Sequence, residues 1–243
     1  AVIAAAEWSF IRDFESEKAR MYSAPQTAPS VIHQQDITHL PEPVRKWMMR
    51  SGAVGRESAV SVYIEQSGSM ITEPGGSTME FTASQYFRND MPGFVWLADV
   101  SMNPLMFLSG RDTYFNGHGR MLIKFFSLFS VVDAAGEQID QGTMLRYMGE
   151  SCWFPSFALS PYVTWQQIDS NSARMIFTYN GKSAEGIYTF TEDGDFSSFE
   201  AMRYYTRKEG ATLERWHISV DKDGYRTFDG FRIPAKLSVT WKL

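Results

Sequence analysis

Charged and aromatic side chains recur at helical spacing between residues 140 and 161. Residues three or four apart share one face of a helix, so Arg146, Glu150 and Trp153 are expected to lie on a common surface. A carboxylate that an indole keeps partly dry has a raised pKa, which suits a general acid or base. Glu150 is therefore a candidate catalytic residue. An ordinary surface ion pair with Arg146, worth about 0.3–0.5 kcal/mol, explains the same spacing.

Asp112 is the candidate partner carboxylate for Glu150. A hydrolase or an isomerase could use two carboxyl groups that face each other across a cleft. Nucleophilic catalysis is not indicated, because the chain has no GxSxG motif and its single cysteine, Cys152, has no adjacent base. A metal site is not indicated either, since the four histidines form no HExxH or HxH motif. We expect neither a metal nor a cofactor.

The other chemical signal in the sequence is apolar. Phe, Tyr and Trp make up 15% of the residues and 13 are Met, and such side chains fill large cores or line cavities for apolar ligands. A ligand cavity also needs a few polar groups that orient the ligand. The predicted ligand-binding residues are Gln85, Trp96, Arg146, Tyr147, Trp153 and Arg203. A filled core made by the same aromatic residues is the alternative.

Charge and hydropathy argue against two kinds of behaviour. The net charge is -5 and the basic residues are scattered, whereas nucleic-acid-binding proteins cluster Lys and Arg to neutralise phosphates. No run of 18 apolar residues occurs, so no bilayer-spanning segment is expected within the 243 residues. The opening AVIAAA resembles the trimmed end of a signal or anchor segment, which would associate the protein with a membrane. An arbitrary chain boundary explains it equally well.

Helical periodicity predicts three helical segments. Residues 5–22 form a modestly amphipathic helix, and residues 40–52 form a short helix with two prolines in its first turn. Residues 23–38 have no periodicity and are typical of an extended linker. The segment 140–161 is the third.

The remaining segments alternate with the period of two that is typical of β-strands. Gly-containing hairpin turns separate them, namely Asn116-Gly117, Asn180-Gly181, Asp193-Gly194, Asp223-Gly224 and Asp229-Gly230. The run 121–132 fits a helix or a strand, and its aromatic and β-branched content favours a strand. The predicted strands are residues 58–66, 79–88, 94–102, 105–114, 121–132, 163–168, 173–179, 184–191, 199–207, 213–220 and 232–243.

Strands joined by local turns predict an antiparallel sheet, because the strand–helix–strand alternation of a parallel sheet is missing. We expect a mainly β fold of the α+β class. It would be a single long, curved antiparallel sheet, an open half-barrel, wrapped over a few short helices. Residues 1–39 would be an N-terminal helix and linker, and residues 40–243 a single domain.

Several stretches of the chain together resemble a bacterial family of unknown function. They are LPEPVRKWMMRSGAVG at 40–55, TASQYF at 82–87, PGFVWLADV at 92–100, GRDTYFNGHGRM at 110–121, RYMGESCWFPS at 146–156 and the closing IPAKLSVTWKL. The resemblance covers roughly residues 40–243 and implies no activity. Members of the family commonly look membrane-anchored, and their overall pattern is similar to the lipoprotein-carrier fold, which has an apolar cavity between sheet and helices.

Three kinds of function remain after this reading. The leading hypothesis is a non-enzymatic protein of the cell envelope that binds a lipid-like or other apolar ligand. The second is a hydrolase or isomerase that uses Glu150 as general acid or base. The third is an envelope scaffold that binds another protein. A cytoplasmic location is the alternative to the envelope.

Overall fold

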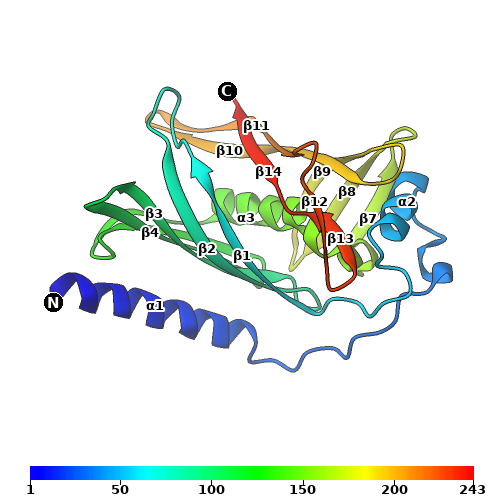
Figure 1. The fold of residues 1–243 in the computed structure, drawn as a ribbon, viewed down its shortest axis with the longest axis horizontal. Coiled ribbons are helices and arrows are strands. Elements are labelled where there is room, and N and C mark those ends of the chain that lie inside the picture. The colour runs from blue at the N-terminus through cyan, green and yellow to red at the C-terminus, as the bar shows by residue number, and fades with distance from the viewer. The chain divides into compact units, whose positions relative to one another are not determined.

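The computed structural model describes residues 1–243, and the chain divides into two compact units (Figure 1). Unit 1 consists of residues 1–26 and 61–143. Unit 2 consists of residues 27–60 and 144–243. The two units are described separately, and the division expected from the sequence, residues 1–39 and 40–243, stays a prediction.

Unit 1 is an antiparallel meander of six strands with a long N-terminal helix. The sheet has the order β1-β2-β3-β4-β5-β6, so every strand pairs with its neighbour in the sequence. The first part of helix α3 completes the unit. The elements are α1 (Val2–Met21), β1 (Ser61–Met70), β2 (Met79–Arg88), β3 (Gly93–Asn103), β4 (Met106–Phe115), β5 (His118–Phe125), β6 (Phe129–Ala135) and α3 (Glu137–Glu150).

Helix α1 packs along one face of this sheet. Phe10, Phe14 and Met21 are its buried residues, and Phe14 and Met21 pack with Val95 of β3. Partly buried Tyr22, Tyr86, Leu97 and Phe115 surround this contact. Beside the β4-β5 turn, the N–H of Gly119 donates to Asp140 of α3 at 2.7 Å. A Cβ at Gly119 would lie 2.8 Å from the carbonyl oxygen of Ile139, so only glycine permits this approach.

Unit 2 contains a second six-stranded antiparallel sheet of order β14-β11-β10-β9-β8-β7 and a separate two-stranded ribbon, β12-β13. The end of α3 and three short 3-10 helices, Gln34–Ile37, Ser151–Trp153 and Pro155–Leu159, belong to the same unit. The other elements are α2 (Glu42–Arg50), β7 (Val163–Gln167), β8 (Ser172–Tyr179), β9 (Lys182–Phe190), β10 (Phe196–Arg207), β11 (Gly210–Val220), β12 (Tyr225–Phe228), β13 (Phe231–Pro234) and β14 (Leu237–Lys242).

Aromatic rings dominate the core of unit 2. Tyr188 of β9 is fully buried, and its ring lies 5.0 Å from that of Phe199, 5.1 Å from that of Trp165 and 6.1 Å from that of Trp47 on α2. Edge-to-face and tilted ring pairs at such separations add about 0.5–1.5 kcal/mol each to the burial of their surface. The aromatic content of the sequence is thus largely used for packing in this unit.

The mainly β, antiparallel fold of the α+β class is confirmed, and neither six-stranded sheet closes on itself. The sequence predicted a single continuous sheet, whereas the strands form two six-stranded sheets and a ribbon. The break lies between β6 and β7, where α3 and two 3-10 helices intervene and no ladder joins the two strands. A strand period cannot show where pairing stops, because each strand looks the same whichever neighbour it pairs with.

Most of the predicted hairpin turns are confirmed, but Asp223-Gly224 joins β11 to β12, which do not pair with each other, and the predicted strand 232–243 is divided between β13 and β14. Asn116-Gly117, Asn180-Gly181 and Asp229-Gly230 all have positive φ at both positions, as type I′ turns require. The predicted strand 121–132 is instead divided between β5 and β6 by a turn at 126–128. Phe126 and Ser127 adopt φ values of 54° and 57° in that turn, a conformation that bulky residues rarely take.

Candidate functional site

Three of the predicted site residues lie in one row across the sheet of unit 1. Gln85 of β2 pairs with Trp96 of β3, and Trp96 pairs with Asp112 of β4. Directly paired residues of neighbouring strands point to the same face, so the three side chains are neighbours on that face. The sheet therefore brings together residues that are separated by up to 27 positions in the sequence.

Sequence reasoning missed Gln66, which connects this row. The indole Nε1–H of Trp96 donates to Gln66 Oε1 at 2.9 Å, and Gln66 Nε2–H donates to Gln85 Oε1 at 2.9 Å. Gln85 is fully buried, so these bonds satisfy polar groups that would otherwise be costly to bury. The signal was present in the sequence, since Gln66 continues the strand face of Val62 and Ile64.

A polar pocket of about 360 Å³ is open over β1, β2 and β3. Most of its side chains, including Glu65 and Asp99, alternate with the Gln66 row and therefore belong to the face on which α1 packs. Partial burial raises the pKa of Asp99, and the negative charge of Glu7 on α1 adds to the rise. The lining residues are Glu65, Gln66, Ser67, Thr82, Ala83, Ser84, Leu97 and Asp99.

In unit 2 the predicted pair of Arg146 and Glu150 forms an ion pair, with Nε 2.8 Å from Oε1. Both side chains are mostly buried, at 13% and 12% exposure, so this is not an ordinary surface pair. Tyr147 is fully buried, and its ring packs against those of Phe154, Phe157 and Phe177.

The other two predicted ligand-binding residues of unit 2 are held by aromatic and backbone contacts. Trp153 donates its Nε1–H to the carbonyl oxygen of Pro234 at 2.9 Å. Arg203 of β10 places its guanidinium 4.7 Å from the ring centre of Trp216 and 5.5 Å from that of Trp241. Both distances are within the range of cation–π attraction.

Catalysis by Glu150 with Asp112 stays a prediction, since Glu150 belongs to unit 2 and Asp112 to unit 1. Cys152 is buried, and burial together with the negative charge of Glu150 raises the pKa of its thiol. Such a thiol is a poor nucleophile. No group of three or more His, Cys, Asp or Glu side chains is placed to hold a metal ion. None of the helices combines the length and apolar character needed to span a bilayer.

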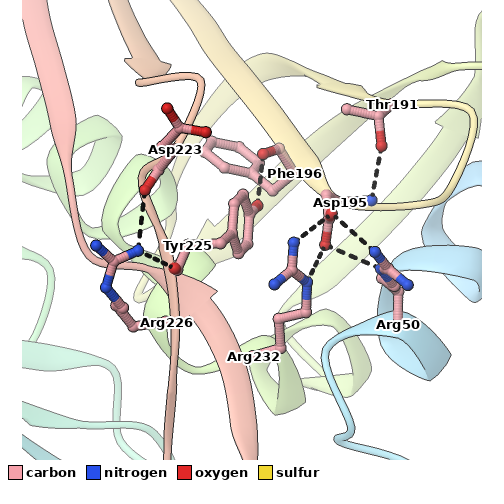
Figure 2. Close-up of polar contacts among 8 residues, drawn as sticks. All are labelled: Arg50, Thr191, Asp195, Phe196, Asp223, Tyr225, Arg226 and Arg232. Atoms are coloured by element: carbon pink, nitrogen blue, oxygen red, sulfur yellow. Dashed lines mark hydrogen bonds and ion pairs between the residues drawn. The ribbon is translucent and has the colours of Figure 1, made fainter.

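Asp195 is the centre of a charged cluster in unit 2 that Figure 2 shows in detail. Arg232 donates to both carboxylate oxygens, at 2.9 and 2.8 Å, and Arg50 of α2 approaches the same oxygens at 3.3 and 3.4 Å. The Arg232 guanidinium also lies 4.6 Å from the ring centre of Tyr225, whose hydroxyl donates to the carbonyl oxygen of Phe196. These contacts join α2, the start of β10 and the β12-β13 ribbon.

Replacement of Asp195 by asparagine is expected to make stability less dependent on pH. Burial alone would raise the pKa of Asp195, but the hydrogen bonds from Arg232 and Arg50 outweigh it and hold the pKa below its ordinary value of 3.8. A depressed folded-state pKa contributes stability above the unfolded-state pKa, and this contribution is lost as the pH falls through the folded value. Because both arginines are partly exposed, solvent screening limits the effect to about 1 kcal/mol.

Urea denaturation of the wild type and of Asp195→Asn between pH 7 and pH 2.5 measures this effect. The gap between the two proteins should be largest near neutrality and should narrow at acid pH. The surface pair Arg174–Glu185, 3.4 Å apart, supplies a matched control through Glu185→Gln. A gap for Asp195→Asn that stays constant with pH would contradict the assignment.

Exposed apolar side chains gather at one end of unit 1. The meander places the β3-β4 and β5-β6 turns at the same end of the sheet, and the ring of Phe107 lies 5.3 Å from that of Phe126. Helix α1 begins at this end, since Phe10 lies near Lys124 of β5 and Met21 near Gly93 at the other end. Figure 1 shows the start of α1 and the β3-β4 turn on the same side. We call this surface the apolar end: Val2, Ile3, Met102, Leu105, Met106, Leu128 and Phe129.

The β5-β6 turn carries backbone strain at the apolar end. Two consecutive non-glycine residues with positive φ cost of the order of 1–3 kcal/mol each. Ser127 is nevertheless held in place, because its hydroxyl lies 2.7 Å from that of Ser109 and both are buried. The turn presents Leu128 and Phe129 to solvent, with Phe129 62% exposed. Strain retained beneath exposed apolar side chains is typical of a functional surface rather than of a simple connection.

Comparison with known proteins identifies a family, but no activity is known for that family. A model described as "Family of unknown function (DUF6544)" matches residues 30–243. No curated protein and no solved structure matches the chain. The family resemblance expected from the sequence is confirmed.

Proposed function

The chain belongs to the DUF6544 family, whose function is unknown. We propose that this member is a non-enzymatic protein of the cell envelope that binds lipid. The apolar end of unit 1 carries this proposal. Leu105, in the β3-β4 turn, is 85% exposed, and Phe129, the first residue of β6, is 62% exposed at the same end of the sheet. Exposed apolar surface of this kind marks a site of contact with a membrane or with another protein.

Lipid is the partner that suits the chemistry of this surface best. Its side chains are aliphatic, aromatic and thioether groups on two hairpin turns, on the strand ends beside them and on a helix start, so they can enter an acyl-chain region together. Full burial of a Leu or Phe side chain is worth about 1.5–3 kcal/mol. Two such residues give weak, reversible binding to a bilayer rather than permanent insertion.

Binding is favoured over catalysis by the state of Glu150. Its carboxylate is engaged by Arg146 at 2.8 Å in a mostly buried pair, so it does not stand alone in an apolar pocket as the catalytic hypothesis expected. The other polar groups predicted to orient an apolar ligand are likewise engaged, because Gln85 accepts a hydrogen bond from Gln66 and the Arg203 guanidinium lies over the rings of Trp216 and Trp241. The lipid proposal therefore rests on the apolar end and not on those residues.

Co-sedimentation with vesicles of phosphatidylethanolamine and phosphatidylglycerol tests this function. The wild type should sediment with the vesicles, and a variant with Leu105→Ser and Phe129→Ser should bind about tenfold more weakly or worse, because two apolar side chains no longer leave water. Both positions are exposed, so the fold should be retained, and circular dichroism checks that it is.

The matched control is Leu213→Ser with Val239→Ser, which removes two exposed apolar side chains from unit 2. This variant should sediment like the wild type. Equal loss in both double variants would assign binding to general hydrophobicity and contradict the proposal. Absence of wild-type protein from the vesicle pellet would also overturn the proposal. The apolar end would then be interpreted as a binding surface for another protein.

A further inference from the structure

We propose that the polar pocket over β1, β2 and β3 binds a linear diamine or polyamine. The pocket measures about 360 Å³, which lies at the small end of the usual range for ligand sites, about 300–1,000 Å³. The side chains that face it are carboxylates, hydroxyls and Leu97, whereas Gln66 and Ala83 direct their side chains to the other face of the sheet, and no Lys or Arg lines the pocket. The proposal concerns unit 1 alone and is independent of lipid binding at the apolar end.

The strand register places the two carboxylates at opposite ends of the pocket. Glu65 pairs with Ser84, which pairs with Leu97, while Ser67 pairs with Thr82, which pairs with Asp99. Glu65 on β1 and Asp99 on β3 are therefore separated by one intervening strand, β2, and are offset by two residues along the strand direction. Standard strand spacings put their Cα atoms about 12 Å apart, and each side chain can reach inward from there. Two separated anionic groups suit a ligand with a cationic group at each end.

One apolar side chain lies within reach of an alkyl chain between the two ammonium groups. Leu97 faces the pocket from the strand of Asp99, two residues away from it, at the end of the row that begins at Glu65. The hydroxyls of Ser84 and Thr82 on β2 lie between the two carboxylates, and Ser67 pairs with Thr82. An ammonium group has three donors and no acceptor, so hydroxyl and carboxylate oxygens can satisfy all of its hydrogens.

The charges around the pocket favour a cation rather than a neutral polyol. Asp99 makes no hydrogen bond or ion pair within the structure, and Glu65 accepts a hydrogen bond from the Tyr63 hydroxyl at 2.9 Å. Glu7 of α1 acts electrostatically on Asp99 and carries the same charge. A bound ammonium group beside Asp99 would relieve this repulsion, which no residue of the lining does.

Isothermal titration calorimetry with putrescine and spermidine at low ionic strength tests the proposal. The wild type should bind both amines, and Glu65→Gln and Asp99→Asn should each weaken binding about tenfold, since each removes one charge-assisted contact. Two ligand controls separate charge from shape: 1,4-butanediol, which has no charge, should not bind, and butylamine, which has one, should bind more weakly than putrescine.

Glu80→Gln is the matched control variant, because Glu80 is an exposed carboxylate on the same face of β2 but does not line the pocket. It should bind putrescine like the wild type. If all three variants lose affinity equally, the amines bind to the net negative charge of the protein and the pocket proposal is wrong. It is equally wrong if the wild type binds neither amine, or if Glu65→Gln and Asp99→Asn bind as the wild type does.

Discussion

Replacement of Arg88 by methionine is expected to lower the free energy of unfolding by about 3–5 kcal/mol. Arg88 is fully buried in unit 1, where Nη1 donates to the carbonyl oxygens of Met21 and Ala24, and Nη2 donates to that of Pro25, all within 2.9 Å. Its Nε also donates to Asp90 at 2.7 Å. Methionine fills the space but leaves three carbonyl groups and a carboxylate without these donors.

Urea denaturation measures the loss, and limited proteolysis locates it. Because Arg88 holds the end of α1 and the residues that follow it, cleavage within residues 23–26 should be faster in the variant. Arg174→Met is the control, since Arg174 is 39% exposed and its pair with Glu185 is solvated. The control should lose less than about 1 kcal/mol. An Arg88→Met protein as stable and as resistant as this control would show that α1 is held in another way.

Replacement of Phe199 by alanine should destabilise the protein by about 3–5 kcal/mol, the usual cost of deleting a buried Phe ring. The ring is fully buried and lies 5.0 Å from the ring of Tyr188 and 6.1 Å from that of Trp216. It also fits against two glycines, because a Cβ at Gly186 would lie 2.3 Å from its edge and one at Gly149 would lie 3.0 Å from it. Few neighbouring side chains can move to fill the space.

A pair of variants tests whether Phe199 explains these glycines. Gly186→Ala should cost about 1–3 kcal/mol through overpacking. The same change in a Phe199→Leu background should cost clearly less, because the smaller side chain leaves room for the new methyl group. The free energies of unfolding from urea denaturation give this coupling directly. If the two changes are additive, Phe199 is not what excludes a side chain at residue 186.

The strands and most turns could be predicted because their signals are local. Alternation over 58–66 or 184–191 reports which side chains face away from solvent, and Asn116-Gly117 has the residues that a type I′ turn requires. The turn at Phe126-Ser127 could not be found in this way. Its residues do not favour positive φ, and it is held by Phe107 and Ser109, which come from another strand.

The candidate sites show the same limit. Gln85, Trp96 and Asp112 were each selected from the sequence. The hydrogen bonds through Gln66 depend on strand register, which could not be predicted from the sequence. Arg88 gave no signal, because its carbonyl partners lie more than sixty positions away. Glu65 and Asp99 were not selected either, since each looks like an ordinary solvent-facing residue of a strand. Contacts between residues that are distant in the sequence become visible only in the folded structure.

The most direct test of lipid binding uses one fluorophore at the apolar end. Burial raises the pKa of the Cys152 thiol, so an added cysteine at Leu105→Cys can be labelled selectively with an environment-sensitive dye. On adding phosphatidylglycerol-containing vesicles, the dye at position 105 should brighten and shift its emission to shorter wavelength, whereas a dye at Leu213→Cys in unit 2 should not change. An unchanged spectrum at position 105, or equal changes at both positions, would contradict binding through the apolar end.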